Sequence, residues 1–151
     1  MPTPLTFREA THADLPAIAA LLADDVLGTE RDGNRHMDAY AHALSAIQAQ
    51  RGNAILLAML DADVVGLLQL TFIPGLSRGG MLRAQIEGVR VGSAHRGQRI
   101  GEAMFAHAIQ RARDAGCGLV QLTTDKRRPD AHRFYERLGF EASHEGLKLT
   151  L

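Results

Sequence analysis

A basic, glycine-containing loop that leads into a helix pattern is the stretch of this sequence best suited to chemistry. The loop covers residues 96–101, RGQRIG. The helix pattern that follows has one shared face, formed by Ile100, Met104, Ala108 and Ala112. The first turn of a helix leaves unpaired N–H groups that carry about +0.5 charge, and Arg96 and Arg99 add positive charge beside them. We therefore expect an anion site here, best suited to phosphate.

The strand pattern just before this loop changes phase. Apolar residues stand at even positions up to Ile86 and at odd positions from Val89 onward. Because strand side chains alternate between two faces, one extra residue must be inserted, and we expect a β-bulge at Glu87 and Gly88. A bulge bends its strand away from the neighbouring strand, and a glycine within a strand often marks close backbone approach. The pattern therefore predicts a ligand slot next to the loop.

Two motifs, in order along the chain, resemble those of the GNAT superfamily of acyl-CoA-dependent N-acyltransferases. The first is the pyrophosphate loop Arg/Gln-x-x-Gly-x-Gly/Ala, which residues 96–101 match except that Arg99 stands at the middle glycine. The second is Ala-x-x-Phe-Tyr-x-x-x-Gly-Phe, which residues 131–140 match. The resemblance covers nearly the whole chain.

The resemblance implies that acetyl-CoA is the acyl donor, with no metal. Arg96 and the backbone N–H groups of residues 97–101 would hold the pyrophosphate, and the strand at Val89 and Val91 would pair with the pantetheine arm; ordinary sheet pairing is the alternative for these valines. Arg128 stands where many relatives carry an asparagine that contacts the cofactor. The expected cofactor-binding residues are therefore Val89, Val91, Arg96, Gly97, Gln98, Arg99, Ile100, Gly101 and Arg128.

Acyl transfer from a thioester to an amine needs a neutral amine and a proton for the departing thiolate. An alkyl ammonium has a pKa near ~10.4, so a base must help it lose a proton at neutral pH. Glu87, at the expected bulge, is the candidate base, and its position resembles the family's catalytic glutamate; the alternative is a polar residue on the strand face opposite Ile86. The family's general acid matches Tyr135, for which packing at the core edge is the alternative.

Together these residues predict a cytoplasmic N-acetyltransferase that acetylates a primary amine of a small molecule or peptide by direct attack in a ternary complex. Residues 130–135, DAHRFY, resemble bacterial acetyltransferases that act on small amines such as aminoalkylphosphonates. Two alternatives stay open: a non-catalytic acyl-CoA-binding sensor or regulatory protein, and a nucleotide-binding module that uses the loop without CoA. The acidic residues Asp24, Asp25 and Glu30 could attract a cationic amine, or could form a solvated helix face.

Composition narrows the classes of partner. Lysine plus arginine equals aspartate plus glutamate at 17 each, which argues against nucleic-acid or membrane binding. The single cysteine, Cys117, cannot form an internal disulfide, and the first residues show no signal-peptide pattern, so we expect the cytoplasm. The histidines show no metal-ligand spacing.

The elements that must position these residues follow from hydrophobic periodicity. Residues 5–8 predict a strand, and Asp14 then caps a helix. The buried stripe of that helix is expected to be Leu15, Ile18, Leu22 and Val26. A second helix has an apolar face made by Met37, Tyr40, Leu44 and Ile47. The apolar run 54–60 predicts a strand covered on both faces, and a hairpin turn joins it to a strand over 64–72.

The second half of the chain predicts shorter elements. A loop over 74–80 precedes the bulged strand, and Gly116 ends the loop helix before a strand over 119–123. A short helix capped by Asp130 should then bury Ala131, Phe134 and Leu138. Residues 140–143 and 147–151 predict two edge strands, which could pair in a homodimer.

The order of these elements predicts one α/β domain of the α+β mixed-sheet type over residues 1–151. It is also the order that the GNAT resemblance implies. In that fold a predominantly antiparallel sheet contains a splayed, bulged central strand and carries helices on both faces.

Overall fold

The protein is described by a computed structural model that covers residues 4–24 and 36–151. The chain divides into two compact units, Met1–Gln121 and Leu122–Leu151, and each is described separately. The expectation of a single domain over residues 1–151 stays a prediction.

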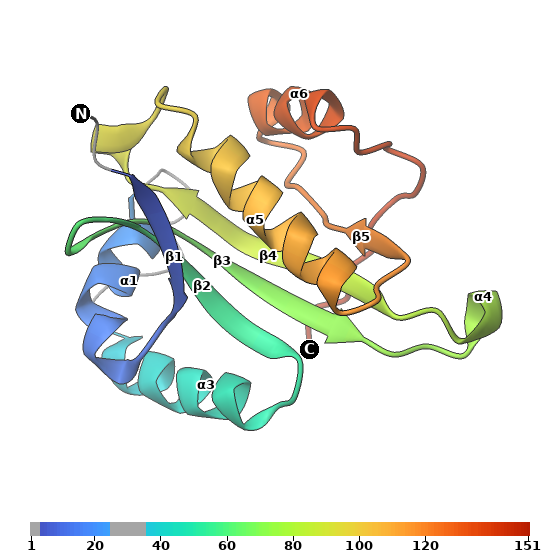
Figure 1. The fold of residues 1–151 in the computed structure, drawn as a ribbon, viewed down its shortest axis with the longest axis horizontal. Coiled ribbons are helices and arrows are strands. Elements are labelled where there is room, and N and C mark those ends of the chain that lie inside the picture. The colour runs from blue at the N-terminus through green and yellow to red at the C-terminus, as the bar shows by residue number, and fades with distance from the viewer. Residues whose placement is uncertain (1–3, 25–35) are drawn as a thin grey trace. The chain divides into compact units, whose positions relative to one another are not determined.

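The first unit is built on a five-stranded sheet in the order β1-β2-β3-β4-β5 (Figure 1). The strands are β1 Leu5–Glu9, β2 Asn53–Leu60, β3 Asp63–Ile73, β4 Arg83–Val91 and β5 Leu119–Gln121. Neighbouring strands are antiparallel except for β4 and β5, which run parallel. This arrangement confirms the predicted mixed, predominantly antiparallel sheet, although β5 ends at Gln121 rather than at residue 123.

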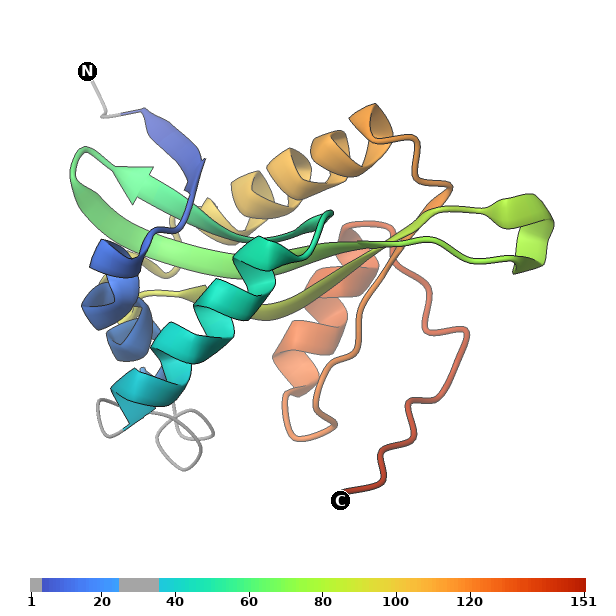
Figure 2. The same cartoon turned by 90° about the horizontal axis from the view of Figure 1, so that it is seen from below.

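Helices cover both faces of this sheet, as predicted (Figure 2). On one face α1 (Leu15–Leu22) and α3 (Met37–Ala49) pack on alternate strand residues, including Leu57 and Leu67. On the other face α5 (Ile100–Asp114) comes so close to β3 that a Cβ built at Gly66 would lie 2.7 Å from Met104 Sδ. Because both faces are covered, residues 56–59 of β2 are buried without interruption.

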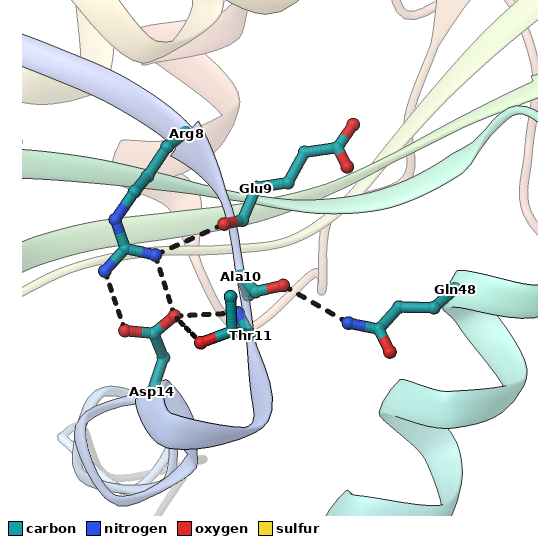
Figure 3. Close-up of polar contacts among 6 residues, drawn as sticks. All are labelled: Arg8, Glu9, Ala10, Thr11, Asp14 and Gln48. Atoms are coloured by element: carbon teal, nitrogen blue, oxygen red, sulfur yellow. Dashed lines mark hydrogen bonds and ion pairs between the residues drawn. The ribbon is translucent and has the colours of Figure 1, made fainter.

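Polar contacts of β1 fix the start of α1 and one side of α3 (Figure 3). Arg8 donates through Nη1 and Nη2 to the two carboxylate oxygens of Asp14, at 2.8 Å each. The Thr11 backbone N–H donates to Asp14 Oδ2 at 2.7 Å. Gln48, on α3, donates through Nε2 to Ala10 O at 3.3 Å. Both helices are therefore tied to the same edge strand.

Asp14 occupies the N-cap position of α1, but the predicted capping bond is absent. Its side chain makes no cap hydrogen bond to α1, because the carboxylate is already engaged by Arg8 and by the 3-10 turn at His12–Asp14. The buried residues of α1 are Leu15, Ile18, Ala19 and Leu21, whereas Leu22 is half-buried and Val26 lies outside the described residues. On α3 only Leu44 of the predicted face is fully buried.

The turns of the first unit follow the sequence pattern with one addition. Asp61 takes a positive φ of 52° in the hairpin turn between β2 and β3. The segment predicted as a plain loop contains a short turn, α4 Ser77–Gly80, in which Arg78 and Gly79 have the positive φ values of 56° and 71°. Gly116, with φ 87°, ends α5 as predicted.

The second unit contains α6, Pro129–Arg137. Its N-cap is Arg128 and not the predicted Asp130, because Pro129 already stands in the first turn and Asp130 follows it, paired with Arg133. Ala131, Phe134 and Leu138 are half-buried rather than fully buried, and Gly139 ends the helix with φ 97°.

The two predicted C-terminal strands are wrong. Residues 140–151 form no strand, and the side chains of Leu147, Leu149 and Leu151 are almost fully exposed. Alternation specifies which side chains share a face, but a strand also needs a ladder partner, and no described segment supplies one.

Candidate active site

The register of β3 and β4 contains the predicted bulge. Gln69 lies opposite Glu87 and Leu67 lies opposite Arg90, so Gly88 and Val89 together face one β3 residue. Gly88 has φ +64°, a conformation that glycine adopts without steric cost. The bulge is therefore confirmed, but it lies at Gly88 and Val89, one residue later than the predicted Glu87 and Gly88, because Glu87 keeps a regular pair with Gln69.

The phase change keeps apolar side chains of β4 on one face. Ile86 pairs with Leu70 before the bulge and Val91 pairs with Gly66 after it, and both partners lie on the face that α5 covers. Glu87 consequently leaves the opposite face of the sheet, toward the side of α1 and α3, and its side chain is exposed. The position suits proton exchange with solvent as well as contact with a ligand.

A cavity of about 170 Å³ lies on this same face, between α1, α3 and the sheet. Most of its wall is aliphatic, including Leu15, Leu44 and Leu67. Gly88 of the bulge and the amide of Gln69 also line it. Because directly opposed residues of antiparallel strands share a face, Glu87 leaves the same face of the sheet as Gln69. Glu87 is next to Gly88 in the chain but does not itself line the cavity.

Sequence reasoning missed Gln69 and the cavity. Gln69 is a polar residue between Leu68 and Leu70 in a mostly apolar strand, and that interruption is the signal that could have identified it. Its Nε2 donates to Asn53 Oδ1 at 3.0 Å, and Thr71 Oγ1 donates to the same oxygen at 3.1 Å. The amide is thus held in a fixed position by neighbouring strand residues.

The loop predicted to bind an anion lies at the start of α5, and anion binding itself stays a prediction. After a 3-10 turn at Ser93–His95, residues 96–99 are exposed and α5 begins at Ile100, which is buried. Gly97 has φ +79°. The N–H groups of the first turn of α5, at residues 100–102, precede the first intrahelical bond, from Ala103 N to Arg99 O.

Arg99 adopts the left-handed conformation, with φ 60° and ψ 21°. This is the position at which the GNAT loop carries its middle glycine. An L-residue with a Cβ is disfavoured there by roughly 1–2 kcal/mol. Arg99 therefore has the backbone conformation typical of a glycine and places a cationic side chain at the N-terminus of α5.

The end of α1 is tied to the anion loop. Arg96 Nη2 donates to the Asp24 carbonyl oxygen at 2.9 Å, and the Ser93 N–H donates to Asp24 Oδ2 at 2.7 Å. A guanidinium has five N–H donors, so this bond leaves Arg96 able to bind phosphate as well. Asp24 thus orders the loop, whereas Asp25 and Glu30, the other acidic candidates, lie outside the described residues.

Beyond the loop, β4 offers an open edge. Its ladder with β5 covers only Arg83–Gln85, and no other described strand pairs with that side of residues 86–91. The strand therefore splays as predicted, and this edge of residues 86–91 has no ladder partner among the described strands, although the Val89 carbonyl oxygen accepts a hydrogen bond from Arg90 Nη1.

Tyr135 and Arg128 belong to the second unit. The Tyr135 ring stands edge-to-face to Phe134 and Phe140, with centroids 5.4 and 6.0 Å away. Arg128 is half-buried at the start of α6. The roles of these two residues, like those of Glu87 and the loop, stay predictions.

The described residues support neither a cysteine nucleophile nor a metal site. Burial raises the pKa of the half-buried Cys117 thiol, which disfavours the nucleophilic thiolate. Within residues 4–24 and 36–151, no group of three or more His, Cys, Asp or Glu side chains could hold a metal ion. No helix in that part of the chain is both long and apolar enough to cross a bilayer.

A bulged strand that splays from its neighbour and leads through a basic loop into a helix defines a class of acyl-CoA-dependent transferases. The sequence model of the acetyltransferase (GNAT) family matches residues 17–140. The chain belongs to this family and is an acetyltransferase; the family's reaction moves an acetyl group from acetyl-CoA to an amine.

Of three individual relatives, two are named as acetyltransferases and one as a transcriptional regulator. The chain is 34% identical over 137 residues to an aminoalkylphosphonate N-acetyltransferase of Salmonella typhimurium, which covers 91% of this chain and 85% of the relative. A crystal structure described as a transcriptional regulator from Bacillus halodurans is 49% identical, with a TM-score of 0.94 over 98% of this chain and 100% of that one. A putative acetyltransferase from Agrobacterium tumefaciens is 30% identical, with a TM-score of 0.83 over 97% and 99%.

Proposed function

We propose that this protein transfers the acetyl group of acetyl-CoA to the primary amine of a small molecule, by direct attack within a ternary complex. The observation that carries the proposal is the shared position of Gly88. It belongs to the bulge beside the open edge of β4 and also to the wall of the cavity. A donor along that edge and an amine in the cavity would meet at this residue.

The donor would be held by residues of the loop and of β4. Arg96, Arg99 and the N–H groups at the start of α5 fit a pyrophosphate, because they combine exposed cations with unpaired donors. Val89 and Val91 would pair by backbone with the pantetheine arm. Acetyl-CoA supplies the thioester whose carbonyl carbon is attacked.

Proton transfers would be carried by two side chains. The Glu87 carboxylate accepts a proton from the ammonium, directly or through water, which frees the nitrogen lone pair for attack. As the C–S bond breaks, Tyr135 Oη donates a proton to the departing sulfur. The attacking nitrogen loses its second proton as the amide forms, and that proton restores the Tyr135 phenol through water. The products are the N-acetyl amine, the free CoA thiol and one proton that Glu87 returns to solvent.

We propose a small amine, and not a protein lysine, as the acceptor for two reasons. The Salmonella relative is named for an aminoalkylphosphonate, which is a small primary amine. The cavity also accommodates a side group rather than a peptide segment. We expect the reaction in the cytoplasm, where the lone Cys117 stays reduced.

The test is release of free CoA thiol when purified protein is mixed with acetyl-CoA and a panel of primary amines. Acetylated product should be found by mass spectrometry for at least one amine, and thiol release should be amine-dependent. Absence of transfer across a broad panel would contradict the proposal.

A second candidate, a non-catalytic acyl-CoA-binding regulator, is favoured by one comparison. The 49% identical structure is described as a transcriptional regulator. Tight calorimetric binding of CoA together with no turnover on any amine would support this candidate over the enzyme.

We also propose a homodimer formed through the C-terminal residues. Leu147, Leu149 and Leu151 alternate with polar residues and are almost fully exposed, so a partner strand from a second copy would bury them. Burial of one leucine contributes roughly 1.5–3 kcal/mol, so Leu149→Ser should weaken a dimer about tenfold or more by light scattering. Thr150→Ser, its neighbour on the other face, is the control.

A further inference from the structure

The lining of the cavity near Glu87 indicates which chemical type of amine it would bind. Its described wall combines aliphatic side chains from α1, α3, β2 and β3 with Tyr40, the amide of Gln69 and the backbone of Gly88. The wall contains no lysine, arginine or histidine among the described residues. Such a surface favours apolar groups and offers a buried anion no counter-charge.

The neighbouring cation does not change this conclusion. Arg90 lies opposite Leu67 and Glu87 lies opposite Gln69, so both belong to this sheet face, and neither is part of the cavity wall. Its Nη1 donates to Val89 O at 2.9 Å. Within the described strand β4 the acidic residue on this face is Glu87, which attracts an ammonium and repels a phosphonate or carboxylate.

The volume of the cavity sets the size of the group it takes. Cavities of about 150 Å³ lined by leucine, isoleucine and phenylalanine hold a benzene molecule. The cavity here, of about 170 Å³, has a similar lining. It therefore suits a phenyl ring or a branched alkyl group of comparable size.

We infer that the acceptor is a primary amine whose uncharged apolar group, about the size of a phenyl ring, sits in this cavity with its ammonium at Glu87. The inference rests on the proposed function and narrows its substrate class. It separates this chain from acetyltransferases of anionic amines, because a phosphonate in the cavity would lose hydration without gaining a counter-ion.

The first test compares two amines that share an aminoethyl unit, 2-phenylethylamine and 2-aminoethylphosphonate. We expect kcat/KM to be at least 100-fold higher for 2-phenylethylamine. In the series ethylamine, butylamine and hexylamine, kcat/KM should rise about fourfold for each methylene that enters the cavity. Equal or higher kcat/KM for the phosphonate would overturn the inference.

The second test narrows the cavity at an exposed position. Ala43 lines the cavity from α3 and is exposed, so Ala43→Leu adds volume to the cavity mouth without disturbing the core. Ala46, also exposed on α3, does not line the cavity. Ala43→Leu should lower the kcat/KM ratio of 2-phenylethylamine to ethylamine at least tenfold, whereas Ala46→Leu should leave it unchanged. Equal ratios in both variants would overturn the inference.

Failure of the inference can be told apart from failure of the proposed function. If no amine is acetylated, the proposed function fails. Calorimetric titration of both amines into the CoA-bound protein still ranks them. Tighter binding of 2-phenylethylamine, weakened by Ala43→Leu, would support the apolar site on its own. Binding of neither amine, or tighter binding of 2-aminoethylphosphonate, would overturn it.

Discussion

Glu87 and Gln69 lie directly opposite each other on β4 and β3, so a carboxylate and an amide leave the same face of the sheet. Gly88, the next residue of β4, lines the cavity together with Gln69. A carboxylate and the wall of an apolar pocket are therefore adjacent at the bulge, where the strand departs from its regular ladder.

The position of Glu87 predicts a large catalytic effect. Glu87→Gln keeps the shape of the side chain but removes the carboxylate, and kcat/KM for the best amine should fall about 100-fold or more. Calorimetry should find CoA affinity within about twofold of the parent protein. Glu141→Gln, an exposed glutamate near the C-terminus, is the matched control and should keep full activity. A Glu87→Gln protein with more than a third of the parent kcat/KM would remove Glu87 from the role of base.

Tyr135→Phe tests the general acid. The variant keeps the ring contacts with Phe134 and Phe140, so folding should be unchanged by circular dichroism. Because the hydroxyl would act only as the sulfur departs, kcat should fall at least tenfold while KM for acetyl-CoA stays within about twofold. Unchanged turnover would leave Tyr135 with a packing role alone.

The left-handed backbone conformation of Arg99 predicts that two substitutions there will differ in stability but not in CoA affinity. Arg99→Gly and Arg99→Ala both remove the charge, but only glycine fits φ 60° without a Cβ penalty. In urea unfolding, Arg99→Gly should exceed Arg99→Ala by about 1 kcal/mol in free energy of unfolding. Both should weaken CoA binding equally, more so at low salt. Equal free energies of unfolding for the two variants would show that a Cβ at position 99 is not strained.

The pair of Arg8 and Asp14 predicts an acid-sensitive component of stability. The hydrogen bonds from Arg8 lower the pKa of Asp14 from 3.8 to about 2, helped by the Thr11 N–H and opposed by burial. A depressed carboxyl pKa stabilises the fold above about pH 4, and this contribution is lost as the pH falls toward 2. Since Arg8 is 44% exposed, solvent screening reduces the effect, and we expect about 1–2 kcal/mol.

Asp14→Asn should therefore lower the free energy of unfolding at pH 7 and leave it little changed at pH 2. Urea unfolding at several pH values measures the difference, and Glu141→Gln again serves as the control. A difference that persists undiminished at pH 2 would show that the carboxylate charge is not its source.

Local patterns in the sequence predicted the bulged strand, the basic loop and the helix that follows it. The phase change between Ile86 and Val89 located the bulge, because alternation cannot shift without an added residue. The basic loop and its helix were also predicted, since Gly97 and the periodic face of α5 are local features. The cap assigned to Asp130 was wrong, because Pro129 begins α6 and Arg128 is its N-cap. Asp14 does occupy the N-cap position of α1, but its carboxylate pairs with Arg8 instead of bonding to the helix.

The sequence by itself determined the family, the bulge and the basic loop before α5, because each depends on residues adjacent in the chain. Only the tertiary structure brought Gln69, Gly88 and the helices α1 and α3 together into one apolar cavity. It also showed that residues 147–151 alternate without forming a strand in this chain. The physical reason is the same in both cases: pairing register and helix packing join residues far apart in sequence, and no local pattern specifies those partners.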